Sequence, residues 1–335
     1  MLLASLPIPS SGSVQRGRLR SGATRLLRSC LAKVGYKMNG GNGHNPHLTF
    51  INPPKRVVSL VPSLSESIIE LGIGDHLVGI TDFCPDPTGE SDLTVAVGGT
   101  RSPDIEAISD LKPELVLANQ EENSLETIQE LEELGIPVWV TFPKNVDDAI
   151  RILWAIARIF HIEKEAAPRL THLERMLDWT RRASLMSPSL KVFCPIWQEE
   201  NEQAGLWWMT INKETYVDSV ISISGGENIF KMRERSYPLE ADLGLAEAEI
   251  AGERDTRYPR VTVEEVKALS PEVVLLPSEP YSFGEEEREQ VLNTLEGTPA
   301  VQEGKVFLLD GRLLTWHGTH LAHALTEVPS YLNFD

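Results

Sequence analysis

Residues 105–117 read I-E-A-I-S-D-L-K-P-E-L-V-L, and residues 263–275 read V-E-E-V-K-A-L-S-P-E-V-V-L. Aligned without a gap, at an offset of 158 residues, the two stretches pair Glu106 with Glu264 and Pro113 with Pro271. Each has apolar residues at i, i+3 and i+6, then a proline and a short branched run, which predicts a helix, a stop and a buried parallel strand. The offset is too long for a solenoid repeat, so the sequence predicts two similar α/β lobes. Two matched lobes in one chain indicate a ligand held in the cleft between them.

The bulk composition is that of a water-soluble protein with an acidic body. The chain has 335 residues, enough for two domains with their own cores, and its hydrophobic fraction of 41% is ordinary. Its longest apolar runs have the length of strands, so we expect no transmembrane helix. The net charge is −18, but residues 38–335 alone carry 24 basic and 49 acidic side chains, or −25. So acidic a body argues against nucleic acid as a partner.

The first residues differ from the rest of the chain in composition. Residues 1–37 hold seven Lys and Arg, and residues 1–65 hold no Asp or Glu. In composition this segment resembles an organellar transit peptide more than a secretory signal. The sequence before Cys30 is not a convincing lipoprotein cleavage site, because it contains Arg28. The alternative is that the segment is disordered, or that it was read in error and Met38 is the true start. Residues 1–54 are therefore predicted to be a disordered or wrongly assigned leader.

Strand and helix patterns alternate on both sides of a long helical segment. Pro62 follows a buried strand, and Ser63 or Ser65 is placed to cap the helix that begins there. The alternation predicts an N-terminal α/β lobe with a mostly parallel sheet over residues 55–144, and a C-terminal α/β lobe over residues 186–332. Between them, residues 145–185 read as a linking backbone helix that Pro168 kinks or splits. Because a long helix resists bending, we expect little closure on ligand binding, and we expect two tryptophans of this helix in the core, Trp154 and Trp179.

Four features together resemble a known family. They are R-V-V-S-L-V-P-S-L-S-E-S at residues 56–67, G-G-T-x-x-P-D-I-E-A-I-x-x-L-K-P-E-L-V-L-A at residues 98–118, the long central helix and the repeated second unit. Over residues 55–330 the chain resembles the helical-backbone, periplasmic-binding-protein-like family. Its members are substrate-binding proteins of ABC importers for cobalamin, ferric siderophores and heme, and the resemblance is closest to the cobalamin-binding branch.

The resemblance implies a fold and a function. The fold is the class III periplasmic-binding-protein fold, in which two Rossmann-like lobes with parallel sheets are joined by a long backbone helix. The function is capture of cobalamin or a similar metal chelate in the cleft, without catalysis and without a cofactor, and delivery to an ABC permease. It also implies a monomer in the periplasm or another extracytoplasmic space.

Permease docking is implied for two glutamates. In that family one surface glutamate on each lobe binds Arg pockets of the permease, and the matching positions here are Glu106 and Glu264. An acid near a helix N-terminus complements the helix dipole and can take bidentate Arg contacts. The alternative is that both are ordinary helix-start acids.

The positions of the strand ends predict which residues line the cleft. Ligands in open α/β sheets lie beyond the carboxyl ends of the strands, and aromatic loop residues suit a large flat ligand. For Trp207 and Trp208, a position in the core is as well supported as a position near the cleft. The predicted ligand-binding residues are Ser63, Phe83, Cys84, Asn119, Gln120, Trp197, Tyr237, Tyr281, Phe283, Trp316 and His317.

Histidines and cysteines leave further alternatives open. His317, His320 and His323 have a spacing of three, so one helix face offers two of them to a metal, with other ligands needed from elsewhere. We predict no protein metal site, although His317 is placed to contact the metal of a bound chelate. Cys84 and Cys194 are expected to be buried free thiols at comparable strand ends.

Catalytic motifs do not support an enzyme. The sequence has no Walker A motif, no H-E-x-x-H and no G-x-S-x-G. Two rivals to the importer remain: an intracellular tetrapyrrole or metal carrier or sensor without a permease, and an enzyme that uses the cleft around Cys84, Cys194 and His317.

Overall fold

The first sheet is parallel throughout and has the doubly wound order β3-β2-β1-β4-β5. The protein is described here from a computed structural model that covers residues 50–84 and 94–332. Cys30, Met38 and most of the leader predicted over residues 1–54 lie outside the described residues. The strands are β1 (Val57–Ser59), β2 (Leu77–Ile80), β3 (Val95–Ala96), β4 (Leu115–Asn119) and β5 (Val138–Thr141). The helices between them are α2 (Pro62–Glu70), η1 (Gly74–His76), α3 (Ile105–Asp110) and α4 (Leu125–Glu133).

A second parallel sheet repeats the arrangement of the first. Its order is β12-β11-β6-β9, so β9-β6-β11-β12 corresponds place by place to β2-β1-β4-β5. The repeated sequence forms α3 and β4 in one sheet and α9 and β11 in the other, which confirms the prediction made from it. The strands are β6 (Leu190–Phe193), β9 (Gly226–Asn228), β11 (Val273–Pro277) and β12 (Val306–Leu309). The accompanying helices are α7 (Tyr216–Ile223), α8 (Leu239–Asp242), α9 (Val263–Leu269), α10 (Glu285–Thr294) and α11 (Pro299–Gln302).

Capping side chains fix the N-termini of both helices of the repeat, but not that of α2. Asp104 caps α3, and Thr262 caps α9 in a reciprocal capping box with Glu265. The capping predicted for α2 is wrong, because that helix begins at Pro62 with Val61 as its N-cap and no side-chain cap. Proline suits the first helical position, where its missing N–H would have no partner in any case.

A third sheet was not predicted. The antiparallel strands β7 (Trp197–Asn201), β8 (Gly205–Met209) and β10 (Arg260–Thr262) pair in the order β10-β8-β7. Trp208 lies fully buried on β8, where its indole N–H donates to Gln198 and its ring packs edge-on against Phe193 at 5.4 Å. Trp207 is buried too, so both tryptophans belong to the core.

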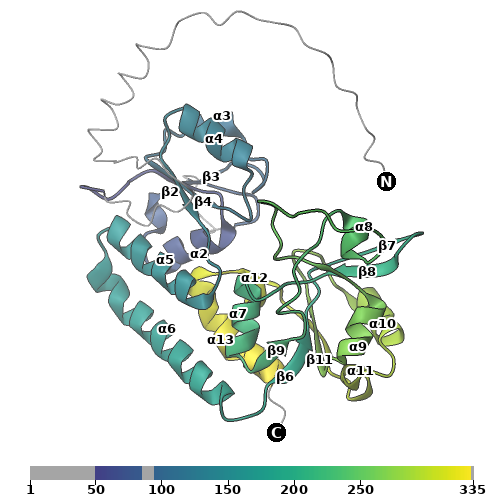
Figure 1. Cartoon of the computed structure of the whole chain (residues 1–335). Coiled ribbons are helices and arrows are strands. Elements are labelled where there is room, and N and C mark those ends of the chain that lie inside the picture. Colours follow the sequence, from purple (N-terminus) through teal and green to yellow (C-terminus); the bar gives the residue numbers. More distant parts are fainter. Residues whose placement is uncertain (1–49, 85–93, 333–335) are drawn as a thin grey trace, which may run out of the picture.

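Two helices, not one, link the two parallel sheets. They are α5 (Val146–Ile159) and α6 (Glu163–Ser184), which run side by side in Figure 1. The chain breaks at residues 160–162, where His161 has a positive φ of 56°, while Pro168 lies inside α6. The prediction that Pro168 interrupts the helix was therefore misplaced. Trp154 packs against the core as predicted, but Trp179 is 78% exposed, and its core assignment was wrong.

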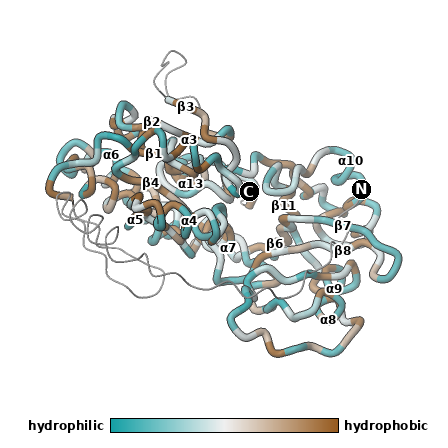
Figure 2. The backbone as a smooth tube through the Cα atoms, turned by 90° about the horizontal axis from the view of Figure 1, so that it is seen from above, coloured by the Kyte–Doolittle hydropathy of each residue, from teal (hydrophilic) through white to brown (hydrophobic). Residues whose placement is uncertain are grey.

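The last elements of the chain pack against the first ones. The closing elements are α12 (Arg312–Thr315), η2 (Gly318–His320), α13 (Leu321–Glu327) and η3 (Val328–Tyr331). One hydrophobic cluster contains Val57 and Leu64 near the start together with Leu321 and Val328 near the end. Figure 2 shows hydrophobic residues gathered along inner strands such as β4 and β11, whose residues are fully buried. We propose that the two parallel sheets are the cores of an N-terminal lobe (55–144) and a C-terminal lobe (186–332), linked through residues 145–185.

Candidate functional site

A cavity of about 1230 Å³ lies between the two parallel sheets. Residues that follow β2, β4, β6 and β11 line it, so it occupies the carboxyl ends of strands from both sheets, the place where open α/β sheets bind ligands. The volume exceeds the roughly 300–1,000 Å³ of ordinary small-molecule pockets. The cavity is therefore large enough for a bulky ligand.

Seven of the predicted ligand-binding residues line this cavity. From the first sheet come Phe83, Cys84, Asn119 and Gln120, and from the later part of the chain come Trp197, Trp316 and His317. Phe83 and Trp197 are 66% and 41% exposed, so their rings are available to a ligand. Contact of these side chains with a ligand remains a proposal.

The other four predicted residues lie outside the cavity. Ser63 is buried within α2, and Phe283 is buried in a hydrophobic cluster of the second sheet. The Tyr281 ring contacts the rings of Phe283 and Trp197, at centroid distances of 4.7 and 5.4 Å. The Tyr237 ring is contacted by two guanidinium groups, those of Arg235 and Arg254, at 4.3 and 4.2 Å.

Charged residues of the cavity were missed by the sequence analysis. Four carboxylates line it, those of Glu121, Glu122, Asp255 and Glu279, together with the guanidiniums of Arg101, Arg257 and Arg312. A signal for two of them was available, because Glu121 and Glu279 are separated by the same 158 residues as the repeated stretches. The repeat therefore places an acid after β4 in one lobe and an acid after β11 in the other.

Arg257 joins the two sides of the cavity. Its Nη1 donates to Glu121 Oε1 at 2.6 Å, while Nε and Nη2 form a fork with Asp255 at 2.9 and 2.6 Å. The guanidinium also lies over the ring of Phe142 at 4.6 Å, and the hydroxyl of Tyr258 donates to the same Glu121 oxygen. Because the Arg257 side chain is only 13% exposed, this is a largely buried ion pair between the two lobes.

Glu122 is an acid without a hydrogen-bond or ion-pair partner among the described residues. It is partly buried in the loop after β4 and lines the cavity. Burial, followed by the charges of Glu121 and Glu279, raises the pKa of its carboxyl to about 8. The environment of Glu122 therefore favours the protonated, uncharged form of its carboxyl at neutral pH.

His317 is held as a neutral ring with a defined tautomer. The backbone N–H of Glu121 donates to Asn119 Oδ1 at 2.7 Å, so the Asn119 amide must turn its NH₂ toward His317 Nε2, 3.2 Å away. Nε2 is then an acceptor and the proton lies on Nδ1, which is buried and has no partner among the described residues. The ring is 4% exposed, and burial lowers the pKa of His317 to about 4. Since Nε2 is occupied, this arrangement does not favour the predicted contact with a chelated metal.

His317 should make the protein sensitive to acid. Its folded-state pKa lies below the unfolded value, so the unfolded state binds more protons between pH 6.5 and pH 4, and stability falls as the pH is lowered through this window. The shift corresponds to a loss on the order of 3 kcal/mol. We expect His317→Gln, whose amide oxygen can still accept from Asn119, to lose less stability than the wild type between pH 7 and pH 4.5 in urea denaturation. Equal losses in the two proteins would contradict this account.

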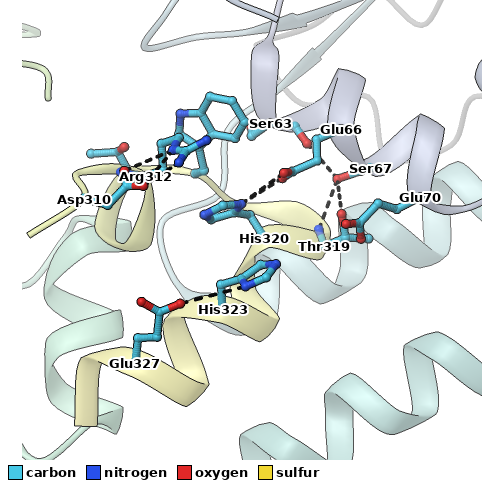
Figure 3. A network of polar contacts seen from close by, with 12 residues as sticks. Ser63, Glu66, Ser67, Glu70, Asp310, Arg312, Thr319, His320, His323 and Glu327 are labelled. Carbon is cyan, nitrogen blue, oxygen red and sulfur yellow. Dashed lines mark hydrogen bonds and ion pairs between the residues drawn. The ribbon is translucent and has the colours of Figure 1, made fainter. Parts of the chain in front are cut away.

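The three histidines face different partners, as Figure 3 shows for two of them. His320 Nδ1 lies 2.9 Å from Glu66 on α2, and His323 lies 4.0 Å from Glu327 on its own helix. Next to them Thr319 donates its backbone N–H to Ser67 Oγ at 3.1 Å, so α2 and η2 are tied together. Within residues 50–84 and 94–332 there is no group of three His, Cys, Asp or Glu side chains arranged to hold a metal ion.

Both described cysteines are free thiols. Cys194 is buried, and burial raises its pKa to about 12. Cys84 lies at the cavity, with its sulfur 3.0 Å from Ser65 Oγ and 3.2 Å from Thr81 Oγ1, and burial raises its pKa also. A thiol with a raised pKa is a poor nucleophile, which does not favour the enzyme alternative.

Glu106 and Glu264 are exposed in the first turns of α3 and α9. Neither carboxylate has an ion-pair partner in the part of the chain that the structure describes. Both are therefore available to a cationic partner, and their docking role remains a proposal. None of the described helices is long and apolar enough to cross a membrane.

Comparison with known proteins identifies relatives of this fold. Residues 57–313 match the sequence model of the periplasmic binding proteins. A vitamin B12-binding protein of Yersinia pseudotuberculosis serotype O:3 (strain YPIII) is 27% identical over 210 residues, which cover 62% of this chain and 69% of that one.

Solved structures show the same fold. A periplasmic heme-binding protein from Roseiflexus sp. RS-1 superimposes with a TM-score of 0.63 at 21% identity, covering 83% of this chain and 97% of that one. The periplasmic vitamin B12-binding protein of Vibrio cholerae superimposes with a TM-score of 0.60 at 22% identity, covering 83% and 96%. The predicted class III fold is thereby confirmed.

Proposed function

The chain belongs to the periplasmic binding protein family, and we propose that it binds a metal tetrapyrrole, cobalamin or a heme-type ligand, in the cavity between its lobes. The observation that carries this proposal is the cavity itself, which is larger than an ordinary pocket and has the rings of Phe83, Trp197 and Trp316 on its wall. Such rings bury the flat faces of a macrocycle. The vitamin B12-binding and heme-binding relatives support the same ligand class.

We propose further that the protein releases its ligand unchanged to an ABC permease, outside the cytoplasm. Family membership supports a non-catalytic carrier, and the exposed pair Glu106 and Glu264 offers two docking points. Cell fractionation tests the location. Recovery of the protein in the cytoplasm would favour the rival carrier or sensor that works without a permease.

Calorimetric titration of the full chain tests the ligand class. The ligands are cobalamin, cobinamide, heme and a ferric siderophore. We expect saturable one-to-one binding of a tetrapyrrole at micromolar or tighter affinity, and recovery of the ligand unchanged after release. If none of the four ligands binds, or if a ligand is recovered chemically altered, the proposed function is refuted.

Trp197 should contribute strongly to ligand affinity. Its ring lines the cavity and is held edge-on by Tyr281, so little ordering is needed when a macrocycle packs against it. We expect Trp197→Ala to weaken tetrapyrrole binding ten- to a hundredfold, or about 1.4–2.8 kcal/mol. The matched control is Trp179→Ala, because Trp179 is exposed on α6 and does not line the cavity. Equal affinities for the two variants would remove Trp197 from the site.

A further inference from the structure

The two faces of the antiparallel sheet β10-β8-β7 differ in what their side chains contact. Arg260 on β10 pairs with Met209 on β8, and residues two apart on a strand share a face, so Trp207 lies on the same face as Arg260. Trp208 points the opposite way, into a hydrophobic cluster that contains Phe193. Trp207 and Arg260 are therefore diagonal neighbours on the face turned away from that cluster.

Buried nitrogen donors on this face lack an acceptor among the described residues. They are Nε1 of Trp207, Nε and Nη1 of Arg260, and Nε of the neighbouring Arg235. The Trp207 side chain is only 3% exposed. Indole and guanidinium nitrogens donate and do not accept, so these groups cannot satisfy one another. Because a buried donor without an acceptor costs free energy, the arrangement favours an acceptor from outside the protein.

Arg235 reaches this face from the segment before α8. Its guanidinium lies over the ring of Tyr237 at 4.3 Å. Burial, and after it the charge of Arg235, lower the pKa of Arg260, as expected of two guanidiniums that lie close together. Asp242 of α8 accepts the backbone N–H of Arg260 at 2.7 Å, so this segment is held against β10. The two arginines therefore share one place on the sheet.

The carboxylates around these two arginines do not pair with them. The second oxygen of Asp242, Oδ1, accepts the backbone N–H of Ser236 at 2.8 Å and lies 3.2 Å from Nη1 of Arg233. Both oxygens of Asp242 are therefore occupied. Glu199 on β7 is exposed and forms no ion pair within the described part of the chain.

The arginines of this region are unevenly paired. Arg233 and Arg254 lie 3.2 and 3.3 Å from their carboxylate partners, whereas Arg235 and Arg260 have no ion-pair partner within residues 50–84 and 94–332. The chain has 49 acidic and 31 basic side chains, so a shortage of acids is not the reason. Two adjacent guanidiniums without a carboxylate are suited to an anion that the protein does not itself supply.

We propose that this face binds a phosphate-type oxyanion between Arg235 and Arg260, with the indole N–H of Trp207 as a further donor. Donors from three side chains suit the tetrahedral oxygens of a phosphoryl group, and guanidiniums bind such groups through paired hydrogen bonds. The other guanidinium nitrogens are not fully buried, so the site opens to solvent.

The oxyanion site is distinct from the cavity between the lobes. Met209 and Trp197, which pair across β8 and β7, line the cavity, whereas Arg260 on the next strand does not. The site therefore begins one strand beyond the cavity wall. The inference goes beyond the proposed function and does not depend on which ligand enters the cavity.

Titration of the full-length protein with inorganic phosphate at constant ionic strength tests the site. In proton–nitrogen correlation spectra, the indole signal that disappears in Trp207→Phe belongs to Trp207, and we expect phosphate to shift it saturably. Calorimetry should show phosphate affinity at least tenfold weaker in Arg260→Met. The matched control is Arg254→Met, because Arg254 stacks on the same Tyr237 ring but is exposed and paired, and its phosphate affinity should stay within twofold of wild type.

A parallel titration with glycerol 3-phosphate distinguishes two sources of the oxyanion. Affinity equal to that of phosphate supports a phosphoryl group carried by a larger molecule, and weaker affinity supports the free ion. The proposal is overturned if phosphate leaves the Trp207 signal unmoved over the millimolar range, if Arg260→Met binds phosphate like wild type, or if acetate shifts the signal equally. If Arg260→Met does not fold, Arg235→Met replaces it under the same criteria.

Discussion

Combining Glu106→Ala with Glu264→Ala should reduce cobalamin uptake by cells at least tenfold while leaving the affinity of the purified protein for its ligand within twofold. Both carboxylates are exposed, one in each lobe, and neither lines the cavity. They lie in first helical turns, where the partial positive charge of the helix end favours an acidic side chain. Loss of both would remove two charge-assisted contacts to a permease, each worth up to about 3 kcal/mol.

A second pair of acids provides the control for this experiment. Glu126 and Glu286 are also exposed acids in first helical turns, one in α4 and one in α10. Glu126→Ala/Glu286→Ala removes the same charge from equivalent helix positions, so uptake should stay near the wild-type level. Uptake that falls equally in both double variants would mean that net charge, and not docking at Glu106 and Glu264, is responsible.

Arg257→Met should lower the free energy of unfolding by about 1–3 kcal/mol, because it removes a side chain that is only 13% exposed and leaves the half-buried carboxylate of Glu121 without its ion-pair partner. Urea denaturation at pH 7 measures this loss. The same change breaks the ion pair between the two lobes, so we also expect a larger radius of gyration in small-angle scattering of the ligand-free protein.

Two comparisons make the Arg257 experiment specific. Arg254→Met removes an exposed guanidinium that is also stacked on a tyrosine and paired with Glu249 at 3.3 Å, and it should cost less than about 1 kcal/mol. Adding Glu121→Gln to Arg257→Met should recover part of the loss, since one unpaired charge is then removed. If Arg254→Met and Arg257→Met are equally destabilising, burial of the pair between the lobes is not what stabilises the protein.

Local sequence patterns predicted most of the fold, because strands buried on both faces and helices with one apolar face leave clear periodicities. The helix and strand of the repeat were found in both copies. The third sheet was missed, since β7 carries charged residues and β8 two adjacent tryptophans, so neither shows the alternation of a half-buried strand. The helix break was assigned to Pro168, but α6 continues through that proline, and the chain turns instead at His161.

The site was predicted only where a strand end marks it. Asn119, Gln120 and Trp197 were found by that rule, and all three line the cavity. Arg257 and Tyr258 were not, because they reach the cavity from a long irregular segment whose path depends on tertiary contacts. The tautomer of His317 depends on an asparagine 198 residues away, a relation that no local pattern carries.

The shared hydrophobic cluster has a consequence for how the protein is made. Val57 and Leu64 leave the ribosome early, but their packing partners Leu321 and Val328 are among the last residues synthesised. The face of the N-terminal sheet that packs on this cluster therefore cannot complete its core while translation is in progress, although the opposite face has a cluster of its own within residues 58–138. Nascent chains halted before about residue 320 should be more sensitive to protease than the released chain, and full protection should arise only after release.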